Sequence, residues 1–545
     1  MRPQVTDLTL DEKIGQLLLV ANWPTIQRAI DGVEKLGCGG VWPGAGPKDD
    51  SGRFREMIKD LQSRAKIPLF ICTDFELGAG QFMTDGTCVE FPALMAYGAI
   101  ADEDDAERLA HLTGAICAQE AEYLGVNITP SPVFDVNTVP TNPICNTRSV
   151  GSDYRKVSRI ATAYALGMQT GRLLGMAKHF AGEGMHEADP HFALEEMNVT
   201  EEEMEAIHLK PFYKAAEAGV ASMMTNHAIY RCYDPDYPVT LSRKIITGIL
   251  REKIGFDGLV VTDAMAMAGI VSRYGPEDAV ILAINAGNDL ILDPTGLENV
   301  HEWVHKALED GRMSIETIDT AVDRILRYKD KLRLFDEPHP TDNKPAMPLA
   351  DRQAVAREVA DKSVTIIRDD ENMLPLLVDP TLKVLLLEPS HPYHEPEWGL
   401  KYNLFSICDA LKQDYPNSDI RYFSSKAGAP ENDEILELAA KADMVFISTS
   451  FKSQAGQVGL LNSVQVDLLR GVAEKCSKCV YVASNPYVAS ELPFAGTIVA
   501  NYGPYRISVE AVRDAMLGKI EFKGKLPVEL PQSIDPSGVE VICHD

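Results

Sequence analysis

Residues 178–191 of this 545-residue chain read KHFAGEGMHEADPH, and the interpretation of the whole sequence starts from them. An apolar run, residues 173–177, leads into the stretch, which then breaks into glycines and charged residues. This pattern predicts a buried strand that ends in a loop. Lys178 and His179 stand at the strand exit, and Asp189 and His191 follow about ten residues later. Because loops at strand ends often carry catalytic residues, we expect these side chains to face one cavity.

Length and charge limit the class of protein. A chain of 545 residues exceeds the size of one hydrophobic core, so two or more domains are expected. The formal net charge of -28 opposes binding to nucleic acid or to an anionic membrane surface, because long-range repulsion acts against both. The same charge says little about an uncharged sugar as a ligand.

The N-terminal residues and the placement of the cysteines predict a cytoplasmic protein. Residues 1–7 lack the apolar core of a signal peptide, and no later run reaches the length of a membrane span. The ten cysteines stand mostly singly inside apolar stretches, as Cys72, Cys117 and Cys408 do. This placement favours reduced, buried thiols over a disulfide framework.

Short apolar runs alternate with helical patterns over the first 335 residues, which is typical of parallel strands joined by helices. Seven or eight such repeats fit a (β/α)8 barrel of the TIM type better than a doubly wound sheet. The runs are residues 39–42, 68–72, 126–129, 175–177, 221–224, 258–261 and 289–292.

Several of these runs end in polar or charged residues. In a parallel barrel all strand ends of one kind face the same mouth, so the pattern gathers these groups around one pocket. They are Asp74, Asp135, Lys178 with His179, Asn226 with His227, and Asp263.

A second α/β unit is predicted beyond the barrel. A helical segment over 318–334 closes the first domain, and the prolines and charges that follow it mark a linker. Further buried-strand candidates then recur with helices between them, at residues 363–367, 383–387, 444–447, 480–483 and 497–500. We therefore expect a catalytic barrel over 1–335, a linker over 336–352 and a C-terminal α/β sandwich domain over 353–545.

The spacing K-H-F-x-G-x-G-x4-D-x-H resembles the signature of the β-N-acetylhexosaminidase branch of glycoside hydrolase family 3. Three positions depart from that pattern: Ala181 stands where the branch commonly has proline, Glu183 where it has histidine, and Pro190 where it has serine or threonine. Segments of the second half, such as 363–368 and 524–528, are also similar to the family's C-terminal domain.

The resemblance implies a role for each strand-end residue. Asp263, in a V-[ST]-D-x-M motif, would be the nucleophile that retaining glycoside cleavage needs, whereas an isolated strand-end aspartate is more often a helix cap. His191 would be the general acid and base, and Asp189 would orient its imidazole. The family's residues around the non-reducing sugar match Asp74, Arg148, Lys178 and His179.

The predicted function is that of a retaining exo-β-N-acetylglucosaminidase that acts on an N-acetylglucosamine-containing oligosaccharide or glycoconjugate without cofactor or metal. A family 3 β-glucosidase and a glycoside phosphorylase remain alternatives, because a histidine base repels phosphate less than a carboxylate does. A sugar-binding protein without turnover is the alternative from another class. A peptidoglycan fragment, a chitin oligomer and other glycoconjugates all stay open as natural substrates.

Overall fold

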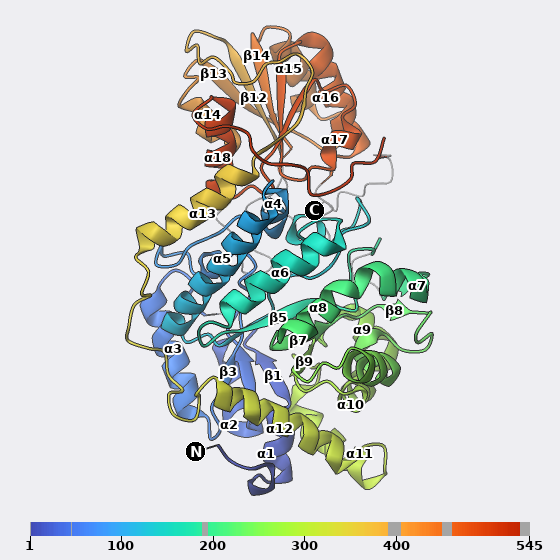
Figure 1. The fold of residues 1–545 in the computed structure, drawn as a ribbon. Coiled ribbons are helices and arrows are strands. Elements are labelled where there is room, and N and C mark those ends of the chain that lie inside the picture. The colour runs from blue at the N-terminus through green and yellow to red at the C-terminus, as the bar shows by residue number, and fades with distance from the viewer. Residues whose placement is uncertain (1, 45, 188–193, 391–404, 450–459, 535–545) are drawn as a thin grey trace.

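Eight parallel strands form a closed barrel in the computed structural model, which describes residues 2–44, 46–187, 194–390, 405–449 and 460–534 (Figure 1). The strands are β1 (Leu18–Ala21), β2 (Gly40–Trp42), β3 (Phe70–Ile71), β4 (Ile128–Thr129), β5 (Leu174–Phe180), β7 (Ser222–Thr225), β9 (Leu259–Thr262) and β10 (Ile291–Leu292). They form two four-stranded sheets, ordered β10-β1-β2-β3 and β4-β5-β7-β9. Bridges from Cys72 to Ile128 and from Val261 to Leu290 join the two sheets on both sides. The predicted (β/α)8 barrel is thereby confirmed.

Helices cover the outside of the barrel (Figure 1). In α12 the buried residues recur every three or four positions, from Ile318 to Leu326, so one face of the helix packs on the strands. The barrel helices are α1 (Leu10–Gln16), α2 (Ile26–Leu36), α3 (Ser51–Arg64), α4 (Leu94–Ala99), α5 (Glu103–Leu124), α6 (Tyr154–Met168), α7 (Glu201–Glu203), α8 (Lys210–Ala218), α9 (Ala268–Tyr274), α10 (Pro276–Ala286), α11 (Val300–Glu309) and α12 (Ile315–Lys331). Two π-helices, Met204–His208 and Lys244–Lys253, and a two-stranded sheet of β6 (Glu196–Met197) and β8 (Ile229–Tyr230) complete this unit.

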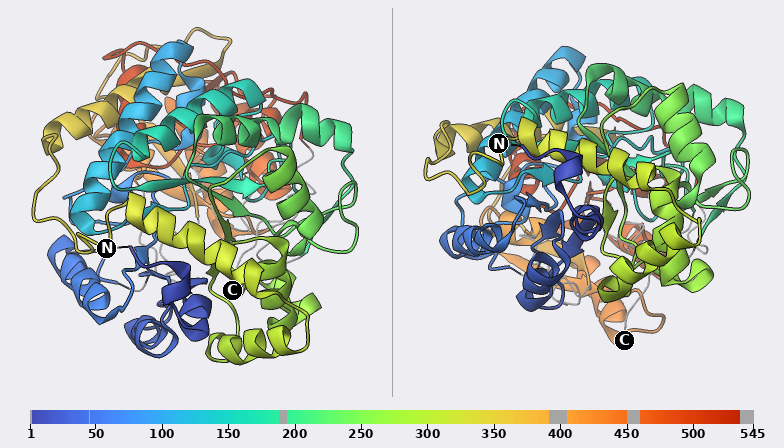
Figure 2. Two further views of the ribbon diagram at one scale, coloured as in Figure 1. Left: turned by 60° about the horizontal axis from the view of Figure 1, so that its bottom comes forward. Right: turned by 90° about the horizontal axis from the view of Figure 1, so that it is seen from below.

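The first helix, α1, begins at a reciprocal pair of capping hydrogen bonds. Glu12 N donates to Thr9 Oγ1, and Thr9 N donates to the Glu12 carboxylate, which is a capping box. α1 and α12 lie at the end of the barrel opposite the second unit (Figures 1 and 2).

The C-terminal unit is built on a six-stranded sheet. Its strands are β11 (Thr365–Asp369), β12 (Val384–Pro389), β13 (Ser418–Phe423), β14 (Met444–Ser448), β15 (Cys479–Ala483) and β16 (Thr497–Ala500). The order is β11-β16-β15-β14-β12-β13, with β11 antiparallel to β16 and the other pairs parallel. Its helices are α13 (Leu349–Ser363), α14 (Ile407–Lys412), α15 (Pro430–Ala439), α16 (Ser463–Lys475), α17 (Val488–Glu491) and α18 (Arg506–Met516).

Both faces of this sheet are buried, because alternate residues of its strands enter different cores. Leu386 and Phe446 pack in one cluster with residues of α14 and α18. Leu385 and Val445 belong to the other cluster, together with residues of α15 and α16. The two helix layers on either side of the sheet are visible in Figure 1. The predicted α/β sandwich is confirmed.

The second unit packs against the end of the barrel where the strands exit. Lys525 N donates to Ala99 O at 2.8 Å, and Ser152 N donates to Pro527 O at 3.2 Å. Tyr505 joins Leu77, which follows β3, in a small buried cluster. The mouth of the barrel therefore faces the second unit. Each helix in the described part of the chain is too short or too polar to cross a lipid bilayer.

Candidate active site

A cluster of ion pairs lies just beyond the end of β3. Arg148 donates two hydrogen bonds to Glu76, from Nε to Oε2 at 2.9 Å and from Nη2 to Oε1 at 2.8 Å. Lys178 Nζ lies 2.5 Å from Glu76 Oε1 and 3.6 Å from Asp74 Oδ1. Asp74, Arg148 and Lys178, three of the residues that the sequence predicts to bind the sugar, therefore meet around Glu76.

The two carboxyl groups of this cluster, Glu76 and Asp74, differ in how strongly their surroundings favour the ionised form. Burial alone would raise the pKa of Glu76, but the charges of Arg148 and Lys178 hold that pKa well below its usual value. Burial raises the pKa of Asp74, and the negative charges of Glu76 and Asp263 add to the rise. Glu76 is thus the fixed counter-ion of the two cations, whereas Asp74 is the carboxylate that is less firmly ionised.

Asp263 follows β9 directly and is half-buried. Its own N–H donates to Thr225 O at 3.1 Å, and its Oδ1 accepts from Ala264 N at 2.7 Å. The loop after it is fixed by His227, whose Nε2 lies 3.1 Å from Ala264 O. Asp263 follows β9 and Asp74 follows β3, and parallel strands of one barrel exit on the same side, so the two carboxylates share the mouth of the barrel. This places a partly accessible carboxylate beside the ion-pair cluster.

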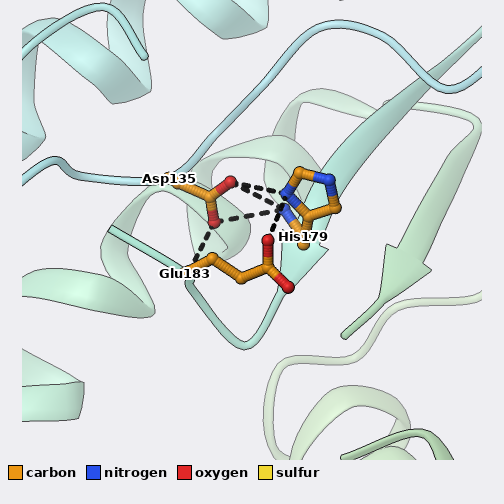
Figure 3. Close-up of side chains that lie close together, drawn as sticks. All are labelled: Asp135, His179 and Glu183. Atoms are coloured by element: carbon orange, nitrogen blue, oxygen red, sulfur yellow. Dashed lines mark hydrogen bonds and ion pairs between the residues drawn. The ribbon is translucent and has the colours of Figure 1, made fainter. Parts of the chain in front are cut away.

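His179 lies against two carboxylates (Figure 3). Its Nδ1 is 2.8 Å from Asp135 Oδ2 and 3.2 Å from Glu183 Oε2. Asp135 also accepts from the main-chain N–H groups of His179, at 3.1 Å, and Glu183, at 2.7 Å. These bonds fix the imidazole plane.

The same three side chains are the one group of metal-ligand type found among the described residues, with ligand atoms all within 4.8 Å of one another. Asp135 already accepts three N–H donors there, and Nδ1 of His179 faces both carboxylates. Because a metal would have to displace the Nδ1 proton from these acceptors, we assign the group as a hydrogen-bonding network.

The predicted general acid, His191, and its partner Asp189 lie outside the described residues. The chain on either side of them is anchored. Glu187 N donates to Glu195 Oε1 at 3.1 Å, which ties the two flanks of residues 188–193 together. His186 Nε2 lies 3.2 Å from the hydroxyl of Tyr230, in β8. Both flanks therefore rest on the β6–β8 side of the mouth.

The sequence prediction gave no role at the site to Glu76, and none to Asp135 beyond a place at the mouth of the barrel. Glu76 carried a usable signal, because it follows Asp74 by two positions at a strand end, where such residues tend to share a face. The sequence predicted Asp135 at the mouth as a strand-end residue. The structure shows in addition that its carboxylate accepts hydrogen bonds from three N–H groups of His179 and Glu183. Glu183, the departure from the family pattern, is only 1% exposed.

The comparison with protein families gives a match over the barrel. The model described as "Glycosyl hydrolase family 3 N terminal domain" matches residues 9–328. A protein of Cellulomonas fimi named "Beta-N-acetylglucosaminidase/beta-glucosidase" is 28% identical over 559 aligned residues, which cover 97% of this chain and 95% of that protein.

Solved structures match both units. A glycoside hydrolase family 3 β-N-acetylglucosaminidase from Paenibacillus sp. str. FPU-7 is similar with a TM-score of 0.84 at 26% identity, covering 97% of this chain and 100% of that one. A β-glucoside phosphorylase is similar with a TM-score of 0.80 at 27% identity, covering 98% of this chain and 95% of that one. The match over nearly the whole chain supports the two-unit fold.

Proposed function

Because the chain belongs to glycosyl hydrolase family 3, we propose that it is a retaining exo-β-N-acetylglucosaminidase that removes terminal non-reducing N-acetylhexosamine residues. The observation that carries the proposal is the position of Asp263. It is a partly accessible carboxylate directly after β9, at the same mouth of the barrel as Asp74, which follows β3. A nucleophile beside a cluster of charged hydrogen-bonding groups is what covalent cleavage of a sugar requires.

In the proposed reaction, an Asp263 oxygen attacks the anomeric carbon of the terminal sugar, and the bond from that carbon to the leaving oxygen breaks. The leaving oxygen takes a proton from the imidazolium of His191, which Asp189 orients. The neutral imidazole then removes a proton from water, the water oxygen attacks the anomeric carbon, and the bond to Asp263 breaks. Two inversions give net retention at that carbon.

We assign binding of the non-reducing sugar to Asp74, Arg148, Lys178 and His179. The Glu76 carboxylate supports this assignment, because it holds both Arg148 and Lys178 at fixed distances. Two cations in a fixed arrangement can orient sugar hydroxyls without paying further side-chain entropy at each binding event.

We also propose that residues 1–335 form the catalytic domain, that 336–352 link it to the sandwich domain over 353–545, and that the protein acts in the cytoplasm. No α-helix or strand lies between the end of α12 at Lys331 and the start of α13 at Leu349 in this fully described segment. The nine described cysteines are free thiols, which fits a reducing compartment. The proposed reaction uses neither cofactor nor metal.

The test is turnover of 4-nitrophenyl N-acetyl-β-glucosaminide and 4-nitrophenyl β-glucoside, each with and without phosphate, with the products identified. We expect the N-acetyl substrate to be preferred by at least roughly tenfold in kcat/KM, because a site built around a polar substituent leaves its own groups unpaired when that substituent is missing. The expected product is the free sugar, with or without phosphate.

Other results would select the alternatives. Equal rates on the two glycosides would indicate a β-glucosidase, an activity that the double name of the Cellulomonas fimi relative includes. Formation of a sugar 1-phosphate would indicate a phosphorylase, the activity named for one of the similar solved structures. Binding of the free sugar without turnover of either glycoside would indicate a sugar-binding protein.

A further inference from the structure

Two tyrosines stack on each other in the loops beyond the strand exits of the barrel. The ring centroids of Tyr237 and Tyr274 lie 5.9 Å apart, with an angle of 29° between the ring planes. Tyr237 is 36% exposed, and Tyr274 is half-buried. The guanidinium carbon of Arg273 lies 5.7 Å from the centroid of the Tyr274 ring. The reaction proposed above gives neither tyrosine a role.

The loop of Tyr237 is tied to the loop of the proposed nucleophile. Tyr237 lies between β8 and the π-helix Lys244–Lys253, and Thr240 follows it by three positions. Thr240 Oγ1 is 2.9 Å from His227 Nδ1, and His227 Nε2 is 3.1 Å from Ala264 O. Because Ala264 follows Asp263 directly, two hydrogen bonds connect the base of the Tyr237 loop to the nucleophile's neighbour.

The other half of the stack belongs to the loop after β9 itself. Met267 N donates to Ala264 O at 3.1 Å, which turns the chain into α9, and α9 ends at Tyr274. β7 and β9 are adjacent parallel strands, and the N–H of Asp263 donates to Thr225 O at the end of β7. The stack therefore joins the loops that leave two neighbouring strands, with Asp263 where those strands end.

The same side of the mouth anchors the flanks of residues 188–193, which include the proposed acid His191. Glu196, the first residue of β6, accepts from Arg231, which follows β8. It also accepts from Arg273 Nη1 at 3.2 Å. β8 and α9 accordingly lie close together (Figure 1). Because a general acid protonates the oxygen of the leaving group, the leaving group lies on the side of the mouth from which that acid comes.

Tyr237 is held in place before any ligand binds. Pro238 restricts its backbone to extended conformations, and the next residue, Val239, donates its N–H to Ala228 O at 2.9 Å. On the other side, Asp236 O accepts from the Tyr274 hydroxyl at 3.0 Å. A ring fixed in this way costs little further side-chain entropy when a ligand packs on it. Since more than a third of Tyr237 stays exposed, part of its surface is open to such a ligand.

We propose that Tyr237, supported by Tyr274, is the platform on which the second sugar ring of the substrate, the leaving group of the reaction, stacks. That the ligand is an oligosaccharide rests on the proposed function. A pyranose has an apolar face of C–H groups that packs on an aromatic ring. Its edge carries hydroxyls, to which the partly exposed guanidinium groups of Arg231 and Arg273 can donate charged hydrogen bonds.

The test is calorimetric binding in an Asp263→Ala background, in which the substrate should persist. N-acetylglucosamine reports on the first sugar site, and N,N′-diacetylchitobiose reports on both sites. Addition of Tyr237→Ala should raise the Kd of the disaccharide by roughly three- to tenfold, the range expected for loss of one aromatic stacking contact. The Kd of the monosaccharide should stay within about twofold, which also shows that the first site is folded.

Three further variants separate stacking from a structural role. Tyr237→Phe keeps the ring and should retain the Kd of the disaccharide, whereas Tyr274→Ala removes the support and should weaken the disaccharide selectively. Tyr422→Ala changes a tyrosine of β13 that is 55% exposed, and should change neither Kd. If Tyr237→Ala weakened both sugars by the same factor, or weakened neither, the proposal would be overturned.

The same measurement separates this proposal from the proposed function. If the Asp263→Ala background bound glucose and cellobiose in place of the N-acetylated sugars, the assigned substrate class would be wrong. Titration of the same variants with that second pair would then test the stack. A selective loss of cellobiose in Tyr237→Ala would support the platform, and an equal effect on glucose and cellobiose would overturn it.

Discussion

Arg148 holds Glu76 with two parallel hydrogen bonds, of 2.9 and 2.8 Å, although the two residues are 72 positions apart in the chain. Lys178 reaches the same carboxylate from β5. Glu76 therefore determines the positions of both cations in the mouth of the barrel. Binding of a sugar there would depend on Glu76 even without a direct contact between the two.

Glu76→Gln should lower kcat/KM for the aryl N-acetylglucosaminide by about a hundredfold. Without the carboxylate, Arg148 and Lys178 repel each other, and a displacement of about 1 Å in such groups is enough for a loss of that size. Steady-state kinetics measure the effect. The matched control is Glu107→Gln, which breaks a more exposed pair with Arg159 and should leave kcat/KM within about twofold. Unchanged kinetics in Glu76→Gln would contradict the assignment of the cluster.

A buried lysine at the other end of the barrel makes stability depend on pH. Lys329 is 0% exposed and donates to Gln16 Oε1 at 2.6 Å, and burial lowers its pKa to about 7. The unfolded value is near 10.4, so between pH 7 and 10 the unfolded chain binds more protons and the free energy of unfolding rises with pH. Below pH 7 the Lys329 side chain is protonated in both the folded and the unfolded chain, so the folded protein bears the full free-energy cost of a buried charge.

Lys329→Met should remove this pH dependence. Relative to the variant, the unmodified protein should gain about 2 kcal/mol in free energy of unfolding between pH 7 and 9, measured by urea denaturation. Lys331→Met, at an exposed position of the same helix, is the control and should show no such change. If the free energies of unfolding of Lys329→Met and the unmodified protein differ by the same amount at every pH, burial does not lower the pKa of Lys329.

The strands that the sequence predicted are those with buried, apolar surroundings. β12 and β14 are buried along their whole length and appear as continuous apolar runs. β13 was missed, because it lies at the edge of the sheet and its central residues, Asp419 to Tyr422, are wholly or partly exposed. β1 was missed for a different reason: it begins two residues after α1, and its leucines extend the helical pattern without a turn signal.

The site was predictable to the extent that its residues follow strands. Asp74, Lys178 and Asp263 could be placed at one mouth, because parallel strands all exit on the same side. The pairing of Glu76 with Arg148 and the convergence of Asp135 and Glu183 on His179 could not be predicted from position alone. Both depend on side-chain directions in loops, for which the sequence has no periodicity.

Asp263→Ala should abolish turnover, because covalent catalysis needs that carboxylate. A fluorinated or otherwise slow substrate should leave a sugar attached to Asp263 in the unmodified enzyme, and mass spectrometry of peptides locates the adduct. Asp257→Ala is the control: this aspartate precedes β9, forms ion pairs with Arg324 and Arg327 on the surface and should be dispensable for turnover. An adduct on another carboxylate would contradict the assignment of the nucleophile.

His191→Ala should impair poor leaving groups far more than good ones. An acidic phenol departs without a proton, whereas a sugar alcohol must be protonated in the transition state, and a positioned general acid contributes about 10²–10⁴-fold where it is needed. The glycosylation step for a chitobiose-type substrate should therefore collapse, while that for an activated aryl glycoside largely survives. Single-turnover kinetics over leaving groups of graded acidity measure the effect.

Asp189→Asn should give a milder version of the same pattern, because an imidazole without its carboxylate partner is still an acid but is less well oriented. If His191→Ala instead lost the same factor with every leaving group, His191 would serve binding or folding, and the acid would have to be another group. Glu183 is a poor replacement, because its side chain is 1% exposed and its Oε2 faces His179 Nδ1. The search would then move to a carboxylate of the second unit, which packs against the mouth of the barrel.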